Sequence, residues 1–133
     1  MIERVVPEGI HPPFANYSHA VLVPPGARWL YVSGQLGVAP DGTVPASFEA
    51  EATQCFENIG AILAEAGMAP VDLVRLNTYL TDEADVRKYM AVRDRFVGDP
   101  PPASTLLVIR ALARPGLRIE VEAVAAQARS GPG

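Results

Sequence analysis

Cysteine is almost absent from this sequence: Cys55 is the only one in 133 residues. A single thiol excludes an intrachain disulfide and any metal site built from several cysteines. Because Cys55 falls within a helical pattern of apolar residues, we expect it to be buried in the core. The two histidines, His11 and His19, have no cysteine or carboxylate cluster nearby, so the sequence predicts no metal site.

Long apolar runs and basic runs are also lacking. No stretch has the length of a membrane span, and residues 1–7 lack the apolar segment of a secretory signal peptide, so we expect a cytoplasmic protein without membrane contact. The net charge of -4 gives no general attraction to nucleic acid, which is therefore not an expected partner. The Gly-x-Ser-x-Gly turn of many serine hydrolases is missing as well, which argues against that class.

The composition that remains suits one globular domain. A chain of 133 residues with 49% hydrophobic and 20% charged side chains has the size and balance of a single packed unit. No internal repeat or linker divides it. We predict one domain over residues 1–129 and a short disordered tail over residues 130–133.

Local patterns predict the order strands, helix, strand, helix, two strands. Short apolar runs predict strands over residues 20–23 and 29–33, and the intervening Pro24-Pro25-Gly26 predicts a turn that joins them in a hairpin. The other expected elements are a helix capped by Ser47 and ended by Gly67, a strand over residues 73–80, a helix capped by Asp82 and ended before residues 100–102, and strands over residues 105–109 and 118–125. We predict an α+β fold in which two helices cover one face of a mixed sheet of about six strands.

Two of these strands are apolar on both faces. Residues 29–32 and 106–109 carry apolar side chains at both alternating positions. Since two helices cover only one face of the sheet, the other face also needs burial, and a second copy of the chain is the simplest source of it. We therefore expect a homo-oligomer.

The last strand alternates strictly between apolar and acidic residues. This period of two places Glu120 and Glu122 on one face. Because unpaired carboxylates are costly to bury, that face turns to water, to a partner or to a ligand. An ordinary solvated strand face and a functional site both remain open for these glutamates.

Several segments together resemble the RidA family, also called YjgF or L-PSP. They are Tyr17 near the first strand, Ser33-Gly34-Gln35 at the end of the second, the Pro102-Ala103 step, and the closing Ile-Glu-Val-Glu-Ala of residues 119–123. The resemblance covers nearly the whole chain and agrees with the element order. It implies a chorismate-mutase-like fold and a homotrimer with a barrel-like centre, in which the helices lie outside and small-molecule sites lie in clefts between subunits.

The resemblance also implies an activity. Similar members hydrolyse reactive enamines and imines such as 2-aminoacrylate, release ammonia and leave a keto acid, with no metal or organic cofactor. By this resemblance Glu122 is the catalytic acid/base. The ligand-binding residues that it implies are Tyr17, Ser33, Gly34, Gln35, Met90, Ser104, Thr105 and Leu106.

The sequence departs from the deaminating members at three of these positions. An arginine that follows their Pro-Ala step is Ser104 here, a cysteine two residues later is Leu106, and an asparagine of the second helix is Met90. A planar guanidinium is the natural partner of a substrate carboxylate, so its loss predicts a less positive cleft that favours a neutral or less acidic ligand. Whether another arginine enters the cleft from a neighbouring subunit stays open; the candidates are Arg28, Arg75 and Arg114.

Two classes of function remain. The first is a hydrolase of the enamine/imine deaminase type that acts on an unidentified small molecule. The second is a non-catalytic trimer that binds a metabolite or partner, or acts as a protective protein. An endoribonuclease, which the L-PSP name suggests, ranks third because the acidic charge does not suit a phosphate-binding surface.

Overall fold

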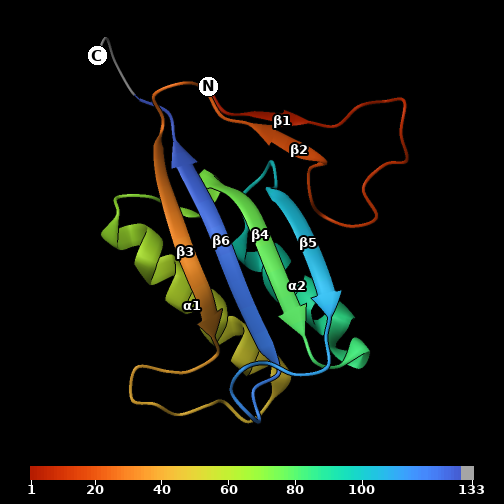
Figure 1. Cartoon of the computed structure of the whole chain (residues 1–133), viewed down its shortest axis with the longest axis vertical. Coiled ribbons are helices and arrows are strands. Elements are labelled where there is room, and N and C mark those ends of the chain that lie inside the picture. The colour runs from red at the N-terminus through yellow and green to blue at the C-terminus, as the bar shows by residue number, and fades with distance from the viewer. Residues whose placement is uncertain (130–133) are drawn as a thin grey trace.

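The computed structural model describes residues 1–129, in which six strands and two α-helices form an α+β fold (Figure 1). The strands are β1 (Glu3–Val5), β2 (Ala20–Leu22), β3 (Arg28–Leu36), β4 (Leu73–Leu80), β5 (Ala103–Val108) and β6 (Ile119–Gln127). The helices are α1 (Phe48–Glu65) and α2 (Val86–Phe96), with short 3-10 turns η1 (Pro70–Asp72) and η2 (Glu83–Asp85). The tail predicted over residues 130–133 lies outside the described residues.

The main sheet has the strand order β3-β6-β4-β5. β4 and β5 run parallel, whereas β6 is antiparallel to both β3 and β4, so the sheet is mixed. Both helices lie behind this sheet and leave its other face open (Figure 1). The predicted α+β fold with two helices on one face of a mixed sheet is confirmed, and the six described strands divide between this sheet and a separate β1–β2 pair.

The predicted hairpin between residues 20–23 and 29–33 is wrong. β2 pairs with β1 in the small sheet, while β3 pairs with β6 in the main sheet. Pro24 and Pro25 have no backbone N–H to donate, so the chain cannot continue β2 into a ladder that pairs with β3. The partner of β2 has only three residues, too few to show strand periodicity.

The predicted helix boundaries depend on caps that the structure contains. Ser47 accepts a hydrogen bond from the Ala50 amide at 3.1 Å and begins α1, and Gly67 follows its end with a φ of 73°. Asp82 accepts from the Ala84 amide at 2.9 Å, but it caps η2, one 3-10 turn before α2 begins. The local signals therefore predict both helix starts to within one turn.

The core lies between α1 and the back of the main sheet. Cys55, Ile59 and Leu63 of α1 are fully buried, as are Leu76 and Ile119 of the strands that they cover. The predicted burial of Cys55 is confirmed, and burial raises the pKa of its thiol well above the ordinary value. Within residues 1–129, neither helix combines the length and apolar character that crossing a membrane requires.

Candidate active site

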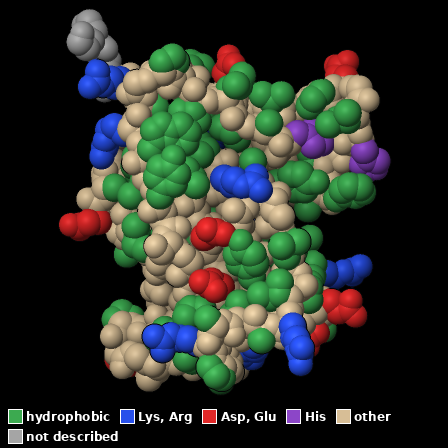
Figure 2. All heavy atoms as spheres, in the orientation of Figure 1, with side chains coloured by type: hydrophobic (Ala, Val, Ile, Leu, Met, Phe, Trp, Pro, Cys, Tyr) green, Lys and Arg blue, Asp and Glu red, His purple; other side chains and the backbone are tan. Residues whose placement is uncertain are grey.

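The open face of the main sheet carries the acidic side chains of β6. Val121 and Ala123 point back into the core and are buried, whereas Glu120 and Glu122 are half-buried on the opposite face. Figure 2 shows this face, with two acidic side chains and one basic side chain in the middle of a largely hydrophobic and neutral surface. The predicted placement of both glutamates on one face is confirmed.

A row of polar residues crosses the sheet at Glu122. In β4 its direct partner is Asn77, and the β5 partner of Asn77 is Thr105. On the other side, the register of β3 jumps from Val32–Ala123 to Gln35–Val121, so Ser33 and Gly34 together lie opposite Glu122 in a β-bulge. The structure thus brings four predicted site residues into one row: Ser33, Gly34, Thr105 and Glu122.

Tyr79 holds one oxygen of the Glu122 carboxylate. Its phenol donates a hydrogen bond of 2.5 Å to Oε1 of Glu122. This bond is the main reason that the pKa of Tyr79 is raised, because the phenol can lose its proton only by giving up the hydrogen bond to the carboxylate. The sequence analysis missed Tyr79, although alternation along β4 places it on the same face as Asn77.

The side chain of Glu120 lies toward β3 and not toward Tyr79. A Cβ atom built on Gly34 would lie 2.0 Å from Oε2 of Glu120, so the Glu120 side chain occupies the space that a side chain at position 34 would need. Glu122 is therefore bound toward β4, while Glu120 covers β3 at the bulge. The two carboxylates have different surroundings, although the sequence pattern treats them alike.

The remaining predicted site residues lie elsewhere. Ser104 and Leu106 pair with Leu76 and Thr78, which face the helices, and Leu106 packs against the core, as does Met90 of α2. Gln35 pairs with Val121 on that same side of the sheet.

Tyr17 lies beside the start of β5. The amide of the next residue, Ser18, donates to the Pro102 carbonyl at 3.0 Å and bridges to Ala103. The phenol oxygen of Tyr17 accepts a hydrogen bond from the Phe14 amide at 3.2 Å.

Within one chain, the sheet separates the two groups of predicted site residues. Ser33, Thr105 and Glu122 are on the open face, whereas Ser104 and Leu106 are on the helix face of an edge strand. A single cleft can contain both groups only if a second chain supplies one of them.

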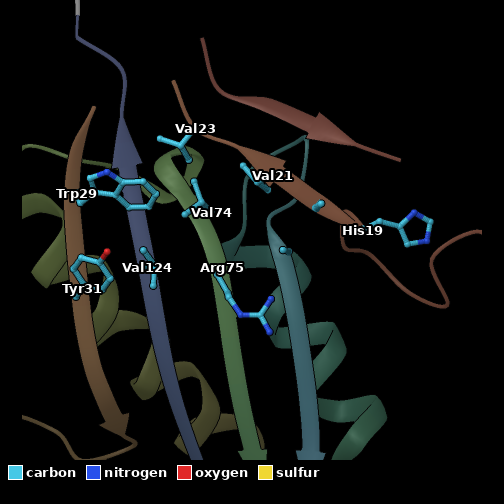
Figure 3. Close-up of a pocket in the computed structure, with 10 residues that line it drawn as sticks. His19, Val21, Val23, Trp29, Tyr31, Val74, Arg75 and Val124 are labelled. Carbon is cyan, nitrogen blue, oxygen red and sulfur yellow. The ribbon is translucent and has the colours of Figure 1, made fainter. Parts of the chain in front are cut away.

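The three candidate replacement arginines have different surroundings. Arg28 donates to Gln127 at 3.0 Å and to the Ala66 carbonyl at 2.9 Å. These bonds hold it at the first residue of β3, at the opposite end of the strand from the bulge. Arg75 extends from β4 toward β5 (Figure 3) and donates to the Thr105 hydroxyl at 2.8 Å. It borders a cavity of about 420 Å³ on the open face, whose other walls include Trp29, Tyr31, Val74 and Val124.

Arg114 borders a different cavity, of about 440 Å³, at the bulge end of β3. Its lining residues are Gly34, Gln35, Leu36, Val38, Asn58 and Arg114. Two of the predicted site residues therefore share a cavity with an exposed guanidinium. Among residues 1–129, no group of three or more His, Cys, Asp or Glu side chains is arranged to hold a metal ion.

Comparison with known proteins gives consistent matches. The sequence profile of the family described as endoribonuclease L-PSP matches residues 9–127. The 2-iminobutanoate/2-iminopropanoate deaminase of Bos taurus is 37% identical over 113 residues, which span 84% of this chain and 80% of the relative. The RutC family protein YjgH of Escherichia coli is 32% identical over 94% of this chain and 96% of its own length. The crystal structure of the Rid-family protein YyfB from Yersinia pestis superposes with a TM-score of 0.84 at 33% identity, covering 95% of this chain and 98% of that one.

Proposed function

This chain belongs to the endoribonuclease L-PSP family, also called the RidA or YjgF family, and we propose that it hydrolyses small enamines or imines to a carbonyl compound and ammonia. The observation that carries the proposal is the carboxylate of Glu122. It lies on the open face, and Tyr79 holds its Oε1. Among the described residues, none donates a hydrogen bond to its Oε2, which leaves that oxygen available to a water molecule.

The chemistry needs one group that can take up and return a proton. Oε2 of Glu122 accepts a proton from a water molecule as the water oxygen bonds to the imine carbon, the C=N electron pair moves to nitrogen, and Glu122 then gives that proton to the nitrogen. In the tetrahedral intermediate Glu122 takes the hydroxyl proton and passes it to the amino group, so that the C–N bond breaks, ammonia leaves and the carbonyl forms with the carboxylate of Glu122 regenerated. For an enamine, protonated Glu122 first transfers its proton to carbon and forms the protonated imine, whose nitrogen needs no further proton when water adds.

We further propose that the site forms between the subunits of a homotrimer. The open face exposes three large apolar side chains, with 50% of Trp29, 75% of Tyr31 and 49% of Leu107 accessible. Such a face favours burial against another copy of the chain. A neighbouring subunit that places Ser104 and Tyr17 against this face would also unite the two groups of site residues that the sheet separates.

The experiment that tests the activity is ammonia release from imines generated in place by an amino-acid oxidase. The proteins compared are the native chain, Glu122→Gln and Ser104→Arg. Ammonia release by the native chain that disappears in Glu122→Gln would support a deaminase that works without an arginine at position 104. No native activity, with a gain in Ser104→Arg, would contradict the proposed hydrolysis.

A non-catalytic binding trimer is the second candidate, and Ser104 is the observation that favours it. Without a cation at this position, the same cleft can hold a ligand but has lost one partner for a substrate carboxylate. The matching family is also described as an endoribonuclease. The net charge of -4 argues against RNA as substrate, and strong salt-dependent RNA binding would reverse that ranking.

A further inference from the structure

We propose that the groove between α1 and α2 binds a free amino acid with an aromatic or similarly large apolar side chain. This site is separate from the candidate active site. Its lining residues all belong to the two helices, which lie on the opposite side of the main sheet from Glu122 (Figure 1). Binding there needs neither Glu122 nor turnover.

The groove has an aromatic floor. Phe56 of α1 and Phe96 of α2 meet there with ring centroids 4.8 Å apart, and the buried Val92 lines the same space. The volume is about 250 Å³, which is below the range for drug-sized ligands and suits a molecule of amino-acid size. Since aromatic rings pack well against one another in tilted arrangements, the floor favours a third ring or a branched apolar side chain.

Gly60 keeps the groove open. Glycine is less favourable than alanine inside a helix, and the φ of Gly60 is not positive, so the backbone of α1 does not require it. Packing does not require it either, because a Cβ atom at this position would lie 3.4 Å from Cε1 of Phe96, an ordinary van der Waals distance. The missing side chain therefore leaves space above the Phe96 ring that a ligand can fill.

The α1 edge of the groove offers hydrogen-bond acceptors. The Thr53 hydroxyl donates to the Glu49 carbonyl at 2.8 Å, so its oxygen is left to accept from a ligand. Glu57, one turn further along the same edge, is exposed and has no hydrogen bond or ion pair to its carboxylate within residues 1–129. These two groups together suit an ammonium group.

The α2 edge offers the opposite charge. Arg95 lines the groove from α2, is exposed, and makes no side-chain hydrogen bond or ion pair to any described residue. Arg95 and Glu57 are the charged residues of the lining, and they are not paired with each other. A zwitterion satisfies both, with its ammonium at Glu57 and its carboxylate at Arg95, whereas a simple anion or amine leaves one of them without a partner.

The test is an NMR titration of the isotopically labelled full chain with L-phenylalanine, followed through the amides of Gly60 and Phe96. Two analogues are titrated in parallel: 3-phenylpropanoate, which lacks the ammonium group, and 2-phenylethylamine, which lacks the carboxylate. We expect saturable binding of phenylalanine, about threefold tighter than that of either analogue, because each exposed charge contact contributes modestly.

Two charge variants give a crossed result. Arg95→Gln should abolish the preference for phenylalanine over 2-phenylethylamine and keep the preference over 3-phenylpropanoate. Glu57→Gln should do the reverse. The matched controls are Arg87→Gln and Glu65→Gln, which remove exposed charges from the same two helices outside the groove and should change each affinity by less than about twofold.

A third variant fills the groove. Gly60→Leu should abolish the saturable shifts at Phe96 while the rest of the spectrum stays native. If this variant does not fold, the crossed result of the two charge variants still decides the proposal.

Four results would overturn the inference. They are the absence of saturable phenylalanine binding, equal affinities of the native chain for the three ligands, shifts at Gly34 and Tyr79 without shifts at Gly60, and preferences that neither charge variant alters. The third result would place the amino acid on the open face. A slower or faster sedimentation of Gly60→Leu, together with no phenylalanine binding by the native chain, would assign the groove to contact with a second copy instead.

Discussion

Tyr79 of β4 and Glu122 of β6 are diagonal neighbours on the open face, joined by a hydrogen bond of 2.5 Å from the phenol to Oε1. This contact orients the carboxylate on which the proposed chemistry depends. It links a residue that the family resemblance implies to one that only the structure identifies.

The first prediction concerns the titration of Tyr79. The pKa of Tyr79 is raised above the ordinary value of 10, and the largest cause is the hydrogen bond to Glu122. The stability that this bond contributes is therefore fully present below pH 10 and is lost as the pH rises through the raised pKa. Glu122→Gln should move the pKa of Tyr79 back toward 10, as measured by NMR of ring-labelled tyrosine. Glu120→Gln is the matched control and should have the smaller effect, because Glu120 acts on Tyr79 only through its charge. Equal shifts in the two variants would contradict this assignment.

The second prediction separates the orienting role of the Tyr79 phenol from the acid/base role of the Glu122 carboxylate by kinetics. Tyr79→Phe keeps the ring and removes the bond that orients Glu122, so kcat should fall by roughly tenfold with little change in KM. Glu122→Gln removes the acid/base itself and should lower kcat by about 10² to 10⁴-fold. Steady-state ammonia release measures both. A Tyr79→Phe enzyme with native kcat would show that the hydrogen bond does not position the carboxylate for reaction.

The third prediction compares two glycines of the same segment. A Cβ on Gly37 would lie 2.3 Å from the backbone oxygen of Glu51, which cannot move without shifting α1, so Gly37→Ala should cost about 2 kcal/mol or more of unfolding free energy. A Cβ on Gly34 would meet the end of the flexible Glu120 side chain instead. Gly34→Ala should therefore cost less than about 1 kcal/mol and change ligand binding. Denaturant unfolding at fixed protein concentration measures the unfolding free energy of both variants. Equal losses of unfolding free energy in Gly37→Ala and Gly34→Ala would contradict the prediction.

The fourth prediction concerns the fully buried Glu51. Its two oxygens accept from the backbone and Nε of Arg118, each at 2.7 Å. Arg118→Met should cost about 3 kcal/mol, because it leaves a buried carboxylate with one partner fewer. Arg87→Met, an exposed change on α2, should stay within about 0.5 kcal/mol. The midpoints of urea unfolding give the comparison, and a near-neutral Arg118→Met would mean that Glu51 does not depend on this pair.

The fifth prediction addresses assembly. A charge on the open face should dissociate the proposed trimer, so Tyr31→Glu should sediment more slowly than the native chain at the same concentration. Val44→Glu alters an apolar side chain that is also exposed, but in the loop before α1, and should leave the sedimentation unchanged. A native chain that sediments as a monomer at micromolar concentration would refute the trimer itself.

The sequence alone determined the features that depend on neighbours along the chain. Alternation placed Glu120 and Glu122 on one face, Ser47 marked the start of α1, and the order of the main elements followed from local periodicity. These signals are readable because side-chain direction and capping depend on residues a few positions apart.

Tertiary structure decided the strand pairing and the side-chain contacts across the sheet, because these features join residues that are distant in sequence. The pairing of β2 with β1, the bulge opposite Glu122 and the contact from Tyr79 arise only when separate strands take one register. The same reason applies to the site residues. Local periodicity gives the face of a side chain relative to its own strand. Only the assembled sheet shows that Ser104 and Glu122 lie on opposite sides of it and that Arg114 lines the cavity at Gly34.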